Sequence, residues 1–405
     1  MEEWKEYKLG EIADIQTGPF GSQLHQSDYV PFGTPCIMPT NIGNQLDINT
    51  EGIVYVKDED VKRLKRHCVK VGDIIYSRRG DIEKCAFISK HEEGWLCGTG
   101  CLRIRINAKD SNPHFIAYQL STKECKKWIV GNAVGTTMLN LNTGILKELP
   151  LLMPERVKQD SVVLILKSLD DKIEVNRRIK DNLKRQAQAL FKSWFVDFEP
   201  FKDGEFVDSE LGMIPKGWRA GTLGDICSQS SLKVGSRNDV KVLSPVTTGI
   251  LLLSEEYFTK QVFSESIAKY KVVKKGAFAY NPARVNIGSL GRNEYNFDGA
   301  VSPVYVVFEC KEGYSNYFDL LRTTKKFKTE VLLRAIGGVR QSLNFVDFAM
   351  IQTIIVPQDI VDAFNPMFER LKSIQKHIEA ENNRLANLRD TLLPKLMSGE
   401  LKENN

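Results

Sequence analysis

The chain has 405 residues, of which 42% are hydrophobic and 26% are charged, a composition typical of a folded protein with two to three domains. No apolar run approaches the roughly 18 residues that a membrane span needs. The opening MEEWKEYKLGEIADIQTG lacks the basic-then-apolar pattern of a signal peptide, so we expect a cytoplasmic protein. The net charge of +5 is mild, and it permits a nucleic-acid partner without requiring one.

The eight cysteines show no spacing that predicts a disulfide framework. The closest pair, Cys97 and Cys101, lacks two further ligands at the short spacing of a zinc site. In a cytoplasmic chain we therefore expect reduced, buried thiols and no bound metal.

The sequence repeats itself with a period near 204 residues. Three pairs of segments carry the repeat: 3–12 with 217–226, 69–77 with 272–281, and 114–154 with 317–357. The last pair aligns without gaps and places Phe115 on Phe318 and Pro154 on Pro357. Two domains built on one plan are therefore expected.

Each half begins with a region of about 150 residues that contains short apolar runs bounded by Gly, Asn and Pro, which is typical of strands. Examples are GDIIYS and CLRIRI in the first half and GAFAY and PVYVVFE in the second. A helix with a basic face follows, near 115–129 and 318–333. A loop with glycine and a final strand ending in proline complete each domain.

A long polar helix follows each domain, and its apolar positions alternate in steps of three and four. In the central helix these positions are Val162, Leu166, Leu169, Ile173, Asn176, Lys180, Leu183, Ala187, Leu190 and Trp194. In the terminal helix they are Leu371, Ile374, Ile378, Glu381, Leu385, Leu388, Leu392 and Lys395. A shift of 205 residues superimposes the two patterns.

So narrow an apolar stripe suits one partner helix rather than a broad core. Because the halves are repeats, a pseudo-twofold axis is natural, and it predicts an antiparallel coiled coil. Two unrelated surface helices are the alternative. A helix of about 38 residues is about 57 Å long, so the pair would fix the distance between the two domains.

Two similar domains on a rigid spacer suit a two-part ligand. Duplex DNA is the obvious one, because half-sites at a fixed spacing can meet similar protein surfaces. At about 3.4 Å per base pair, a helix of this length spans at most roughly 17 pairs. The sequence therefore predicts a split target with an unread middle.

Four segments resemble the specificity subunit of type I restriction–modification systems: GPFGSQLHQSDY, LDDKIEVNRRIKDNLKRQAQALFKSWFVDFEPF, SELGMIPKGWRAGTLGDI and LRDTLLPKLMSGEL. The resemblance covers the whole length. It implies an α+β protein with two pseudo-repeated β-rich target-recognition domains, separated by two long helices that form an antiparallel coiled coil. The expected segments are 1–155 and 201–360 for the recognition domains, and 156–200 and 361–405 for the helical regions.

The resemblance also implies a non-catalytic subunit that binds double-stranded DNA and reads a bipartite target. It would direct two modification subunits, which methylate adenine at N6, and the restriction subunits, which cleave DNA with ATP. S-adenosylmethionine, ATP and Mg²⁺ are expected in those partner subunits and none of them in this chain.

The recognition domains of this family vary in sequence, so base-reading candidates rest on side-chain chemistry. Arginine can hold guanine through two hydrogen bonds, and asparagine or glutamine can hold adenine in the same way. The DNA-binding candidates are Ser22, Gln23, Ser77, Arg78, Arg79, Thr136, Thr137, Asn281, Arg284, Arg340 and Gln341, with Lys126 and Lys326 for phosphates. For each residue alone, an exposed turn with solvated charge is the alternative.

The aromatic run ALFKSWFVDFEPF ends the central helix, and we expect it to pack against the neighbouring domain. In the family, this region and its C-terminal counterpart contribute to docking of the modification subunits. The partner-binding candidates are Phe191, Trp194, Phe195, Leu392 and Leu396.

Two other classes of function remain open. The first is a methyltransferase or nuclease with unrecognised motifs. NPAR at Asn281–Arg284 has Ala and Arg where an adenine methyltransferase has a second proline and an aromatic residue, and the sequence has no GxGxxG unit or GxxxxGK[ST] loop. The second is a coiled-coil scaffold for protein partners only. Binding of S-adenosylmethionine by the purified chain would favour the enzyme, and loss of selective DNA binding on changing Arg340 and Gln341 to alanine would count against the scaffold.

Overall fold

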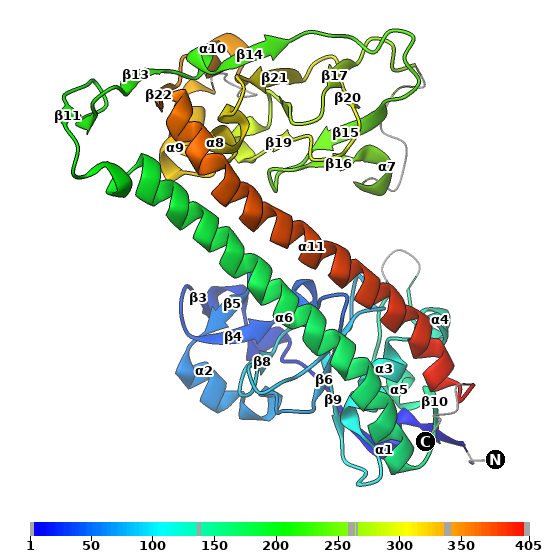
Figure 1. The fold of residues 1–405 in the computed structure, drawn as a ribbon. Coiled ribbons are helices and arrows are strands. Elements are labelled where there is room, and N and C mark those ends of the chain that lie inside the picture. Colours follow the sequence, from blue (N-terminus) through cyan, green and yellow to red (C-terminus); the bar gives the residue numbers. More distant parts are fainter. Residues whose placement is uncertain (1–3, 136–138, 258–263, 265, 336–341, 401–405) are drawn as a thin grey trace. The chain divides into compact units, whose positions relative to one another are not determined.

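The computed structural model describes residues 4–135, 139–257, 264, 266–335 and 342–400 (Figure 1). The chain divides into two compact units. Unit 1 comprises Met1–Arg177 and Glu379–Asn405, and unit 2 comprises Arg178–Ile378. Each unit therefore contains one β-rich domain and half of each long helix.

The main sheet of unit 1 is antiparallel, in the order β2-β9-β6-β7. Its strands are β2 (Ala13–Thr17), β9 (Cys101–Ile106), β6 (Ile74–Ser77) and β7 (Cys85–Phe87). Side chains alternate between the two faces of a strand, and both faces of β6 are buried. Ile74 and Tyr76 pack with helix residues such as Phe115, whereas Ile75 packs with residues of the second sheet. The main sheet is thus the middle layer of the domain.

The second sheet of unit 1 has the order β3-β5-β4-β8, and only its β4–β8 pair is parallel. Its strands are β3 (Tyr29–Val30), β5 (Val54–Val56), β4 (Thr34–Ile37) and β8 (Leu96–Cys97). A separate antiparallel pair joins β1 (Lys5–Lys8) to β10 (Pro150–Met153). The helices of this domain are α1 (Leu9–Ile12), α2 (Asp58–Arg63), α3 (Pro113–Leu120), α4 (Lys123–Asn132) and α5 (Thr143–Lys147).

Unit 2 repeats this plan, with a main sheet in the order β14-β21-β18-β19. Its strands are β14 (Cys227–Ser230), β21 (Val306–Cys310), β18 (Phe278–Tyr280) and β19 (Leu290–Arg292). The second sheet has the order β16-β15-β20-β17, formed by β16 (Leu251–Leu253), β15 (Lys241–Pro245), β20 (Gly299–Val301) and β17 (Lys271–Val273). The remaining strands pair as β13 (Arg219–Thr222) with β22 (Gln352–Ile355) and as β11 (Phe206–Val207) with β12 (Ile214–Pro215). The helices are α7 (Ser254–Tyr257), α8 (Tyr314–Leu321), α9 (Lys325–Arg334) and α10 (Phe345–Ala349).

The predicted repeat is confirmed, but the gapless alignment of its longest segment is wrong by one residue. The N-caps of α4 and α9 are Thr122 and Thr324, and those of α5 and α10 are Asn142 and Asn344. Each cap side chain accepts a hydrogen bond from a backbone N–H of the first helical turn, so these residues are equivalent. The equivalence requires an offset of 202 residues, whereas the sequence alignment used 203.

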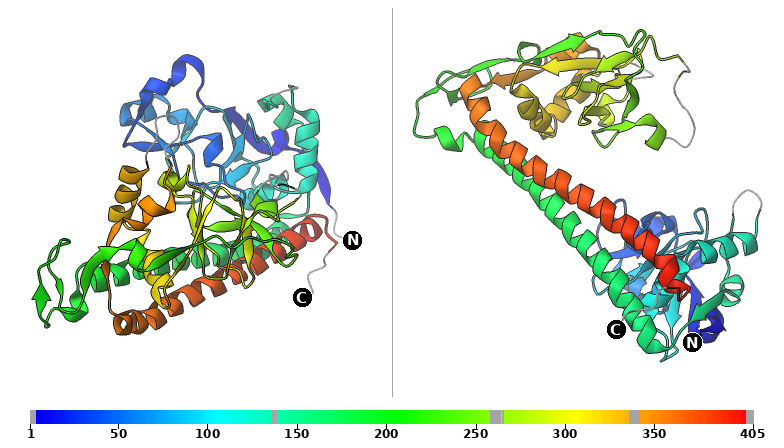
Figure 2. Two further views of the ribbon diagram at one scale, coloured as in Figure 1. Left: turned by 90° about the horizontal axis from the view of Figure 1, so that it is seen from above. Right: turned by 45° about the vertical axis from the view of Figure 1, so that its right-hand side comes forward.

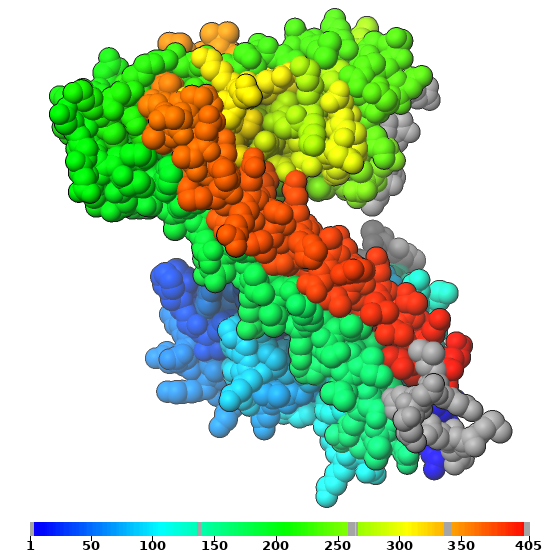
Figure 3. Space-filling model, viewed as in Figure 1, coloured from blue at the N-terminus to red at the C-terminus, as the bar shows by residue number. Residues whose placement is uncertain are grey.

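The two long helices are α6 (Arg156–Phe195) and α11 (Gln358–Met397), 40 residues each. Within unit 1 they pack antiparallel, because Asp170 lies against Arg389 while Asn176 lies against Glu381 and Asn382. Their visible surfaces meet along a common line in the space-filling view (Figure 3).

Within unit 2 the two long helices also pack against each other. The ring of Phe195 lies 4.7 Å from that of Phe364, and the ring of Trp194 lies 5.7 Å from it, both measured between ring centroids. Figure 2 shows the two helices beside each other in both additional views. The predicted fold class, with two repeated β-rich domains and an antiparallel helix pair, is confirmed.

The predicted seam is right for α6, where Val162, Leu166, Ile173, Asn176 and Leu183 are all buried. In α11 the predicted positions Ile374, Leu388 and Lys395 are wrong by one residue, whereas Glu381 is half-buried and accepts a hydrogen bond from Asn176. Ile374 and Leu388 are 40% and 47% exposed, and Lys395 is exposed as well. The inward positions are instead Leu371, Gln375, Ile378, Asn382, Leu385, Arg389, Leu392 and Leu396. The register is set by polar pairs with α6, and hydrophobicity alone does not reveal those pairs.

Candidate nucleic-acid interface

Four loops meet at one edge of the main sheet of unit 1. Gly18 N–H donates to the carbonyl of Cys101 at 2.9 Å, and Arg78 N–H donates to that of Gly100 at 2.8 Å. Leu141 N–H donates to the carbonyl of Arg78 at 2.9 Å. These bonds join the segments after β2, before β9, after β6 and after α4 into one surface, which we call the loop edge of unit 1.

A glycine is required where the first loop crosses this edge. A Cβ atom on Gly18 would lie 2.0 Å from the carbonyl oxygen of Gly98, which is closer than any side chain allows. Ser22 in the same loop is exposed. Gln23 is half-buried, and its Oε1 is buried without a hydrogen-bond partner among the described residues. Ser22 is therefore the more accessible of these two candidates.

The three candidates after β6 differ in their surroundings. Ser77 is buried, and its hydroxyl donates to the carbonyl of Arg79 at 3.0 Å. Arg78 is half-buried, and its Nε donates to the carbonyl of Leu141 at 3.1 Å and to Oδ1 of Asn140 at 3.3 Å. Arg79 is exposed. Ser77 and Arg78 thus shape the loop edge, and Arg79 is the side chain best placed to reach a ligand.

Unit 2 has an equivalent loop edge. Leu343, the counterpart of Leu141, donates its N–H to the carbonyl of Pro282 at 3.1 Å. Asn281 accepts a hydrogen bond from Ala283 N–H at 3.0 Å, which fixes the turn after β18. Arg284 is exposed at the end of this turn. The same connection between the strand-end turn and the distant loop is therefore built twice.

A cavity of about 480 Å³ opens at the loop edge of unit 2. Its lining residues are Gln229, Asn281, Pro282, Ala283, Val304, Val306, Ser342, Asn344, Phe345 and Val346. They come from β14, from the turn after β18, from the start of β21 and from the start of α10. No charged side chain is among these described residues.

The two lysine candidates lie elsewhere, at the N-terminal turns of α4 and α9. Lys126 lines a cavity of about 370 Å³ in unit 1, and Lys326 lines one of about 640 Å³ in unit 2. With the offset of 202 residues, Lys326 occupies the position of Glu124, so these two lysines are not counterparts. The matching pairs are Lys123 with Lys325 and Lys126 with Lys328.

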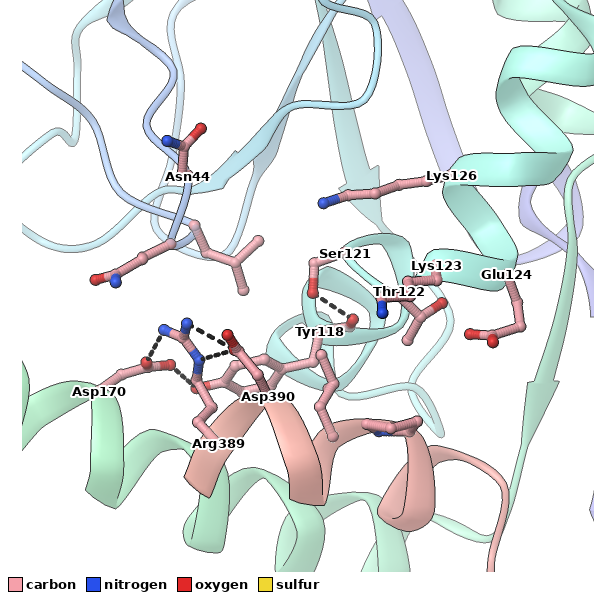
Figure 4. Close-up of a pocket in the computed structure, with 14 residues that line it drawn as sticks. Asn44, Tyr118, Ser121, Thr122, Lys123, Glu124, Lys126, Asp170, Arg389 and Asp390 are labelled. Atoms are coloured by element: carbon pink, nitrogen blue, oxygen red, sulfur yellow. Dashed lines mark hydrogen bonds and ion pairs between the residues drawn. The ribbon is translucent and has the colours of Figure 1, made fainter. Parts of the chain in front are cut away.

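The cavity of unit 1 lies between α3, α4 and the two long helices (Figure 4). Arg389 bonds Asp170 at 2.8 Å and Asp390 at 2.8 Å on its floor. Tyr118 donates its hydroxyl to Asp170 at 2.5 Å. Burial, reinforced by the charge of Asp170, raises the pKa of Tyr118, which stays protonated as the donor. This network attaches α3 to both long helices.

Unit 2 attaches its β-rich domain to α11 through a different set of charges. Asp319 on α8 bonds Arg322 at 2.7 Å and Lys372 of α11 at 3.1 Å, and Arg292 lies 3.9 Å away. Burial alone would raise the pKa of Asp319, but the charges of Arg322, Lys372 and Arg292 outweigh it and lower that pKa to about 2.

The partner-binding candidates are mostly core residues. Phe191, Phe195 and Leu396 are buried, while Trp194 and Leu392 are half-buried. The ring of Phe195 lies 5.0 Å from that of Tyr317 on α8 of the β-rich domain. Phe191 and Phe195 still contribute to the wall of the cavity of about 640 Å³. The predicted packing of the aromatic run against its neighbouring domain is confirmed, and partner contact by these residues stays a prediction.

Residues 1–185 match the family described as the type I restriction modification DNA specificity domain. The match covers all of the β-rich domain of unit 1 and most of α6. Over 99% of its length the chain is also 27% identical to the type I restriction enzyme MjaIX specificity subunit of Methanocaldococcus jannaschii, covering 94% of that protein.

The chain is thus similar to type I specificity subunits over nearly its whole length, and its first 185 residues match the DNA specificity domain of that family.

Two further relatives support this assignment of the specificity subunit. The HindI specificity subunit of Haemophilus influenzae is 29% identical over half of this chain and 43% of its own length. The crystal structure of a type I S subunit from M. genitalium superimposes with a TM-score of 0.58 at 14% identity, covering 98% of this chain and 96% of that one. The latter shows that the fold is shared. The relatives that match the chain are named as specificity subunits of type I restriction enzymes.

Four base-reading candidates of the specificity subunit, Thr136, Thr137, Arg340 and Gln341, lie outside the described residues. Among the residues that are described, no group of three or more His, Cys, Asp or Glu side chains could hold a metal ion. In the same part of the chain, no helix has the length and apolar character to cross a bilayer.

Sequence reasoning missed Gln229, Asp319 and Arg389. Asp319 and Arg389 are charged residues on helices whose solvated faces carry many charges, so nothing in the sequence marks them as buried. Gln229 did leave a signal, because strand β14 reads CSQS where its counterpart β2 begins with ADI. Aligning these two strands would have shown an amide at an apolar position.

Proposed function

We propose that this specificity subunit reads a bipartite DNA target, one half-site at the loop edge of each unit. The observation that carries the proposal is the repeated loop edge, in which Leu141 bonds Arg78 and Leu343 bonds Pro282. One chain thus presents two similar but differently lined surfaces, which suits two short sequences of different composition. Exposed Arg79 and Arg284 supply donors for base edges or phosphates.

In this proposal the antiparallel helix pair sets the unread spacer between the half-sites. The 40 residues of α6 correspond to about 60 Å of helix. At about 3.4 Å per base pair, that length spans at most roughly 17 pairs.

The modification and restriction subunits supply catalysis, with S-adenosylmethionine, ATP and Mg²⁺ bound by them rather than by this chain. The cavities beside α4 and α9 are the places where two modification subunits would dock. They begin at equivalent residues, Thr122 and Lys123 in unit 1 and Thr324 and Lys325 in unit 2. Two equivalent cavities predict two copies of one partner.

Methylome sequencing of a host that expresses the chain with its modification subunits tests the reading function. We expect methylated adenine in one motif made of two half-sites with an unread middle. Exchanging residues 1–155 for those of another family member should change one half-site and leave the other intact. A change in both half-sites, or methylation without any motif, would contradict the proposal.

Native mass spectrometry of the same complex tests the docking. We expect two modification subunits on the wild-type chain and one on the double variant Lys123→Glu, Lys126→Glu. Lys90→Glu, on an exposed turn of the same unit, is the matched control and should retain two. The docking proposal fails if the double variant also retains both subunits.

A further inference from the structure

The cavity at the loop edge of unit 2 contains a polar residue, Gln229, that the fold does not require. Gln229 lies on β14 opposite Phe308 of β21. In unit 1 the corresponding residue is Ile15, which lies on β2 opposite Ile104 and is buried in the core. Unit 2 thus exposes an amide where its repeat buries an apolar side chain. Because Ile15 satisfies the same strand position, folding does not demand a polar group there.

The side-chain amide of Gln229 is available to a ligand. It forms no hydrogen bond with any residue that the structure describes, whereas Asn281 at the same cavity uses its Oδ1 within its own turn. An amide offers one donor and one acceptor side by side. That pair matches the N6 and N7 positions of adenine in the major groove.

The rest of the cavity wall is apolar and exposed. Val304 and Val346 are 72% and 71% exposed, and Pro282 and Ala283 stand beside Asn281. Exposed valines at a loop edge gain nothing from folding and are stabilised only when something covers them. The methyl group of thymine is the apolar group that the major groove presents.

Charge separates this cavity from a phosphate site. Phosphate contacts come chiefly from Lys and Arg, and no described residue that lines the cavity carries a charge. A cavity whose described lining combines an amide with exposed valines and carries no charge suits a base edge rather than the DNA backbone.

We propose that this cavity reads one A·T base pair of the half-site bound by unit 2, with the Gln229 amide on adenine and Val304 on the thymine methyl. The inference rests on the proposed function and names the residues that specify one position of the target. Gln229 donates from Nε2 to N7 and accepts at Oε1 from the N6 amino group.

The test uses the complex of the full chain with its modification subunits and duplexes of the motif found by methylome sequencing. Affinity is measured with each base pair of the second half-site changed in turn. For the wild-type complex, replacing the relevant A·T pair should weaken binding about tenfold or more, as expected for a bidentate contact. Gln229→Ala should abolish the preference at that position alone. Ser228→Ala, on the same strand but outside the cavity, should change nothing.

A second measurement isolates the apolar contact. Replacing thymine by uracil removes only the methyl group and should weaken binding about fourfold at the same base pair. Val304→Ala should reduce this difference, and thermal unfolding of each variant confirms that it is folded.

The outcomes separate the two proposals. If the wild-type complex shows no bipartite preference, the proposed function fails and this inference fails with it. If the wild type is selective but Gln229→Ala keeps every preference, only this inference is overturned. A second half-site without an A·T pair, or a lost preference in the first half-site, overturns it as well.

Discussion

At the scale of single residues, the specificity subunit keeps several ionisable groups in states that depend on burial. His114 on α3 stacks on Phe87 with ring centroids 3.9 Å apart, and it stacks on Tyr118 at 5.1 Å. Burial, together with the nearby charge of Lys167, lowers the pKa of His114 to about 4. The imidazole is therefore a neutral aromatic ring in the folded protein at neutral pH.

Because His114 is buried as a neutral ring, we expect the free energy of unfolding to fall in acid. Because its pKa is lower in the folded state than the usual 6.5, stability is fully present above pH 6.5 and is lost as the pH falls towards 4. Between pH 7.5 and 4.5 we expect the free energy of unfolding to fall by about 2 to 3 kcal/mol from this group alone. Denaturant unfolding at both pH values measures it.

The variant His114→Phe should remove that part of the pH dependence, because phenylalanine keeps the stacking and cannot be protonated. His25→Gln, at an exposed position, is the matched control and should leave the dependence unchanged. Equal pH dependence in wild type and His114→Phe would contradict the assignment.

Asp319 gives the opposite kind of prediction, because positive charges stabilise its ionised form. Asp319→Asn leaves Arg322 without a carboxylate partner and leaves Lys372 with Glu294 alone, and we expect a loss of about 3 to 5 kcal/mol in the free energy of unfolding at pH 7. Acid should reduce the difference, since the stabilisation by the wild-type carboxylate is lost as the pH falls from 3.8 through about 2, and only part of it should remain at pH 2.5.

Urea unfolding at pH 7 and pH 2.5 measures both effects of the Asp319 variant. Asp197→Asn removes a surface pair with Lys192 and should barely move the midpoint. If Asp319→Asn leaves the free energy of unfolding at pH 7 unchanged, the charges around Asp319 do not hold the domain on α11.

At the scale of elements, the seam of α11 shows what the sequence could and could not predict. The stripe of α6 follows from apolar spacing, because its buried positions are nearly all apolar. In α11 the buried Arg389 pairs with Asp170 of α6 as well as with its neighbour Asp390, and Asn382 accepts a hydrogen bond from Asn176 of α6. Such pairing depends on both helices together. The apolar pattern of α11 alone therefore predicted Ile374 and Leu388 as seam positions, although both are exposed.

The offset of the repeat was predicted wrongly, by one residue, for a different reason. The gapless alignment paired Phe115 with Phe318 because the two residues are of the same type, although Phe115 corresponds to Tyr317. The paired caps Thr122 and Thr324, with Asn142 and Asn344, were present in the sequence and would have corrected it. Among the site residues, sequence chemistry found Arg79 and Arg284 at exposed turns. It missed Gln229, although an alignment of β14 with β2 would have shown an amide at an apolar position. The accessibility of that amide depends on the cavity around it, which the sequence does not show.

Alanine substitution distinguishes the two registers of α11. Leu388→Ala should change the free energy of unfolding by less than about 0.5 kcal/mol, because the side chain is 47% exposed. Leu396→Ala should cost about 2 to 5 kcal/mol, because that side chain is buried in the core of unit 1. Thermal and denaturant unfolding of the two variants provide the comparison, and the seam described here is wrong if Leu388→Ala is the more damaging change.

At the scale of the whole molecule, we expect the length of the helix pair to set the length of the unread spacer. Seven added residues, inserted in α6 between Arg177 and Leu183 and matched by seven in α11 between Gln375 and Glu381, preserve the heptad phase of both helices. They lengthen each helix by about 10 Å, which corresponds to about three base pairs.

We expect the unread spacer of the methylated motif to grow by about that amount while both half-sites stay the same. Methylome sequencing gives the answer directly. Inserting the seven residues in α6 alone is the control, and it should disrupt pairing with α11 rather than lengthen the spacer. Altered half-sites in the matched variant would show that the helix pair does not set the spacing.

The core of unit 1 has a consequence for how the protein is made. Leu396 and Met397, near the end of α11, pack there with Val162 and Leu166 of α6 and with the β-rich domain that begins the chain. A ribosome therefore translates the whole of unit 2 before it delivers the last piece of unit 1. During synthesis the second domain can finish folding first, and a premature stop codon before α11 leaves the earlier domain incomplete as well.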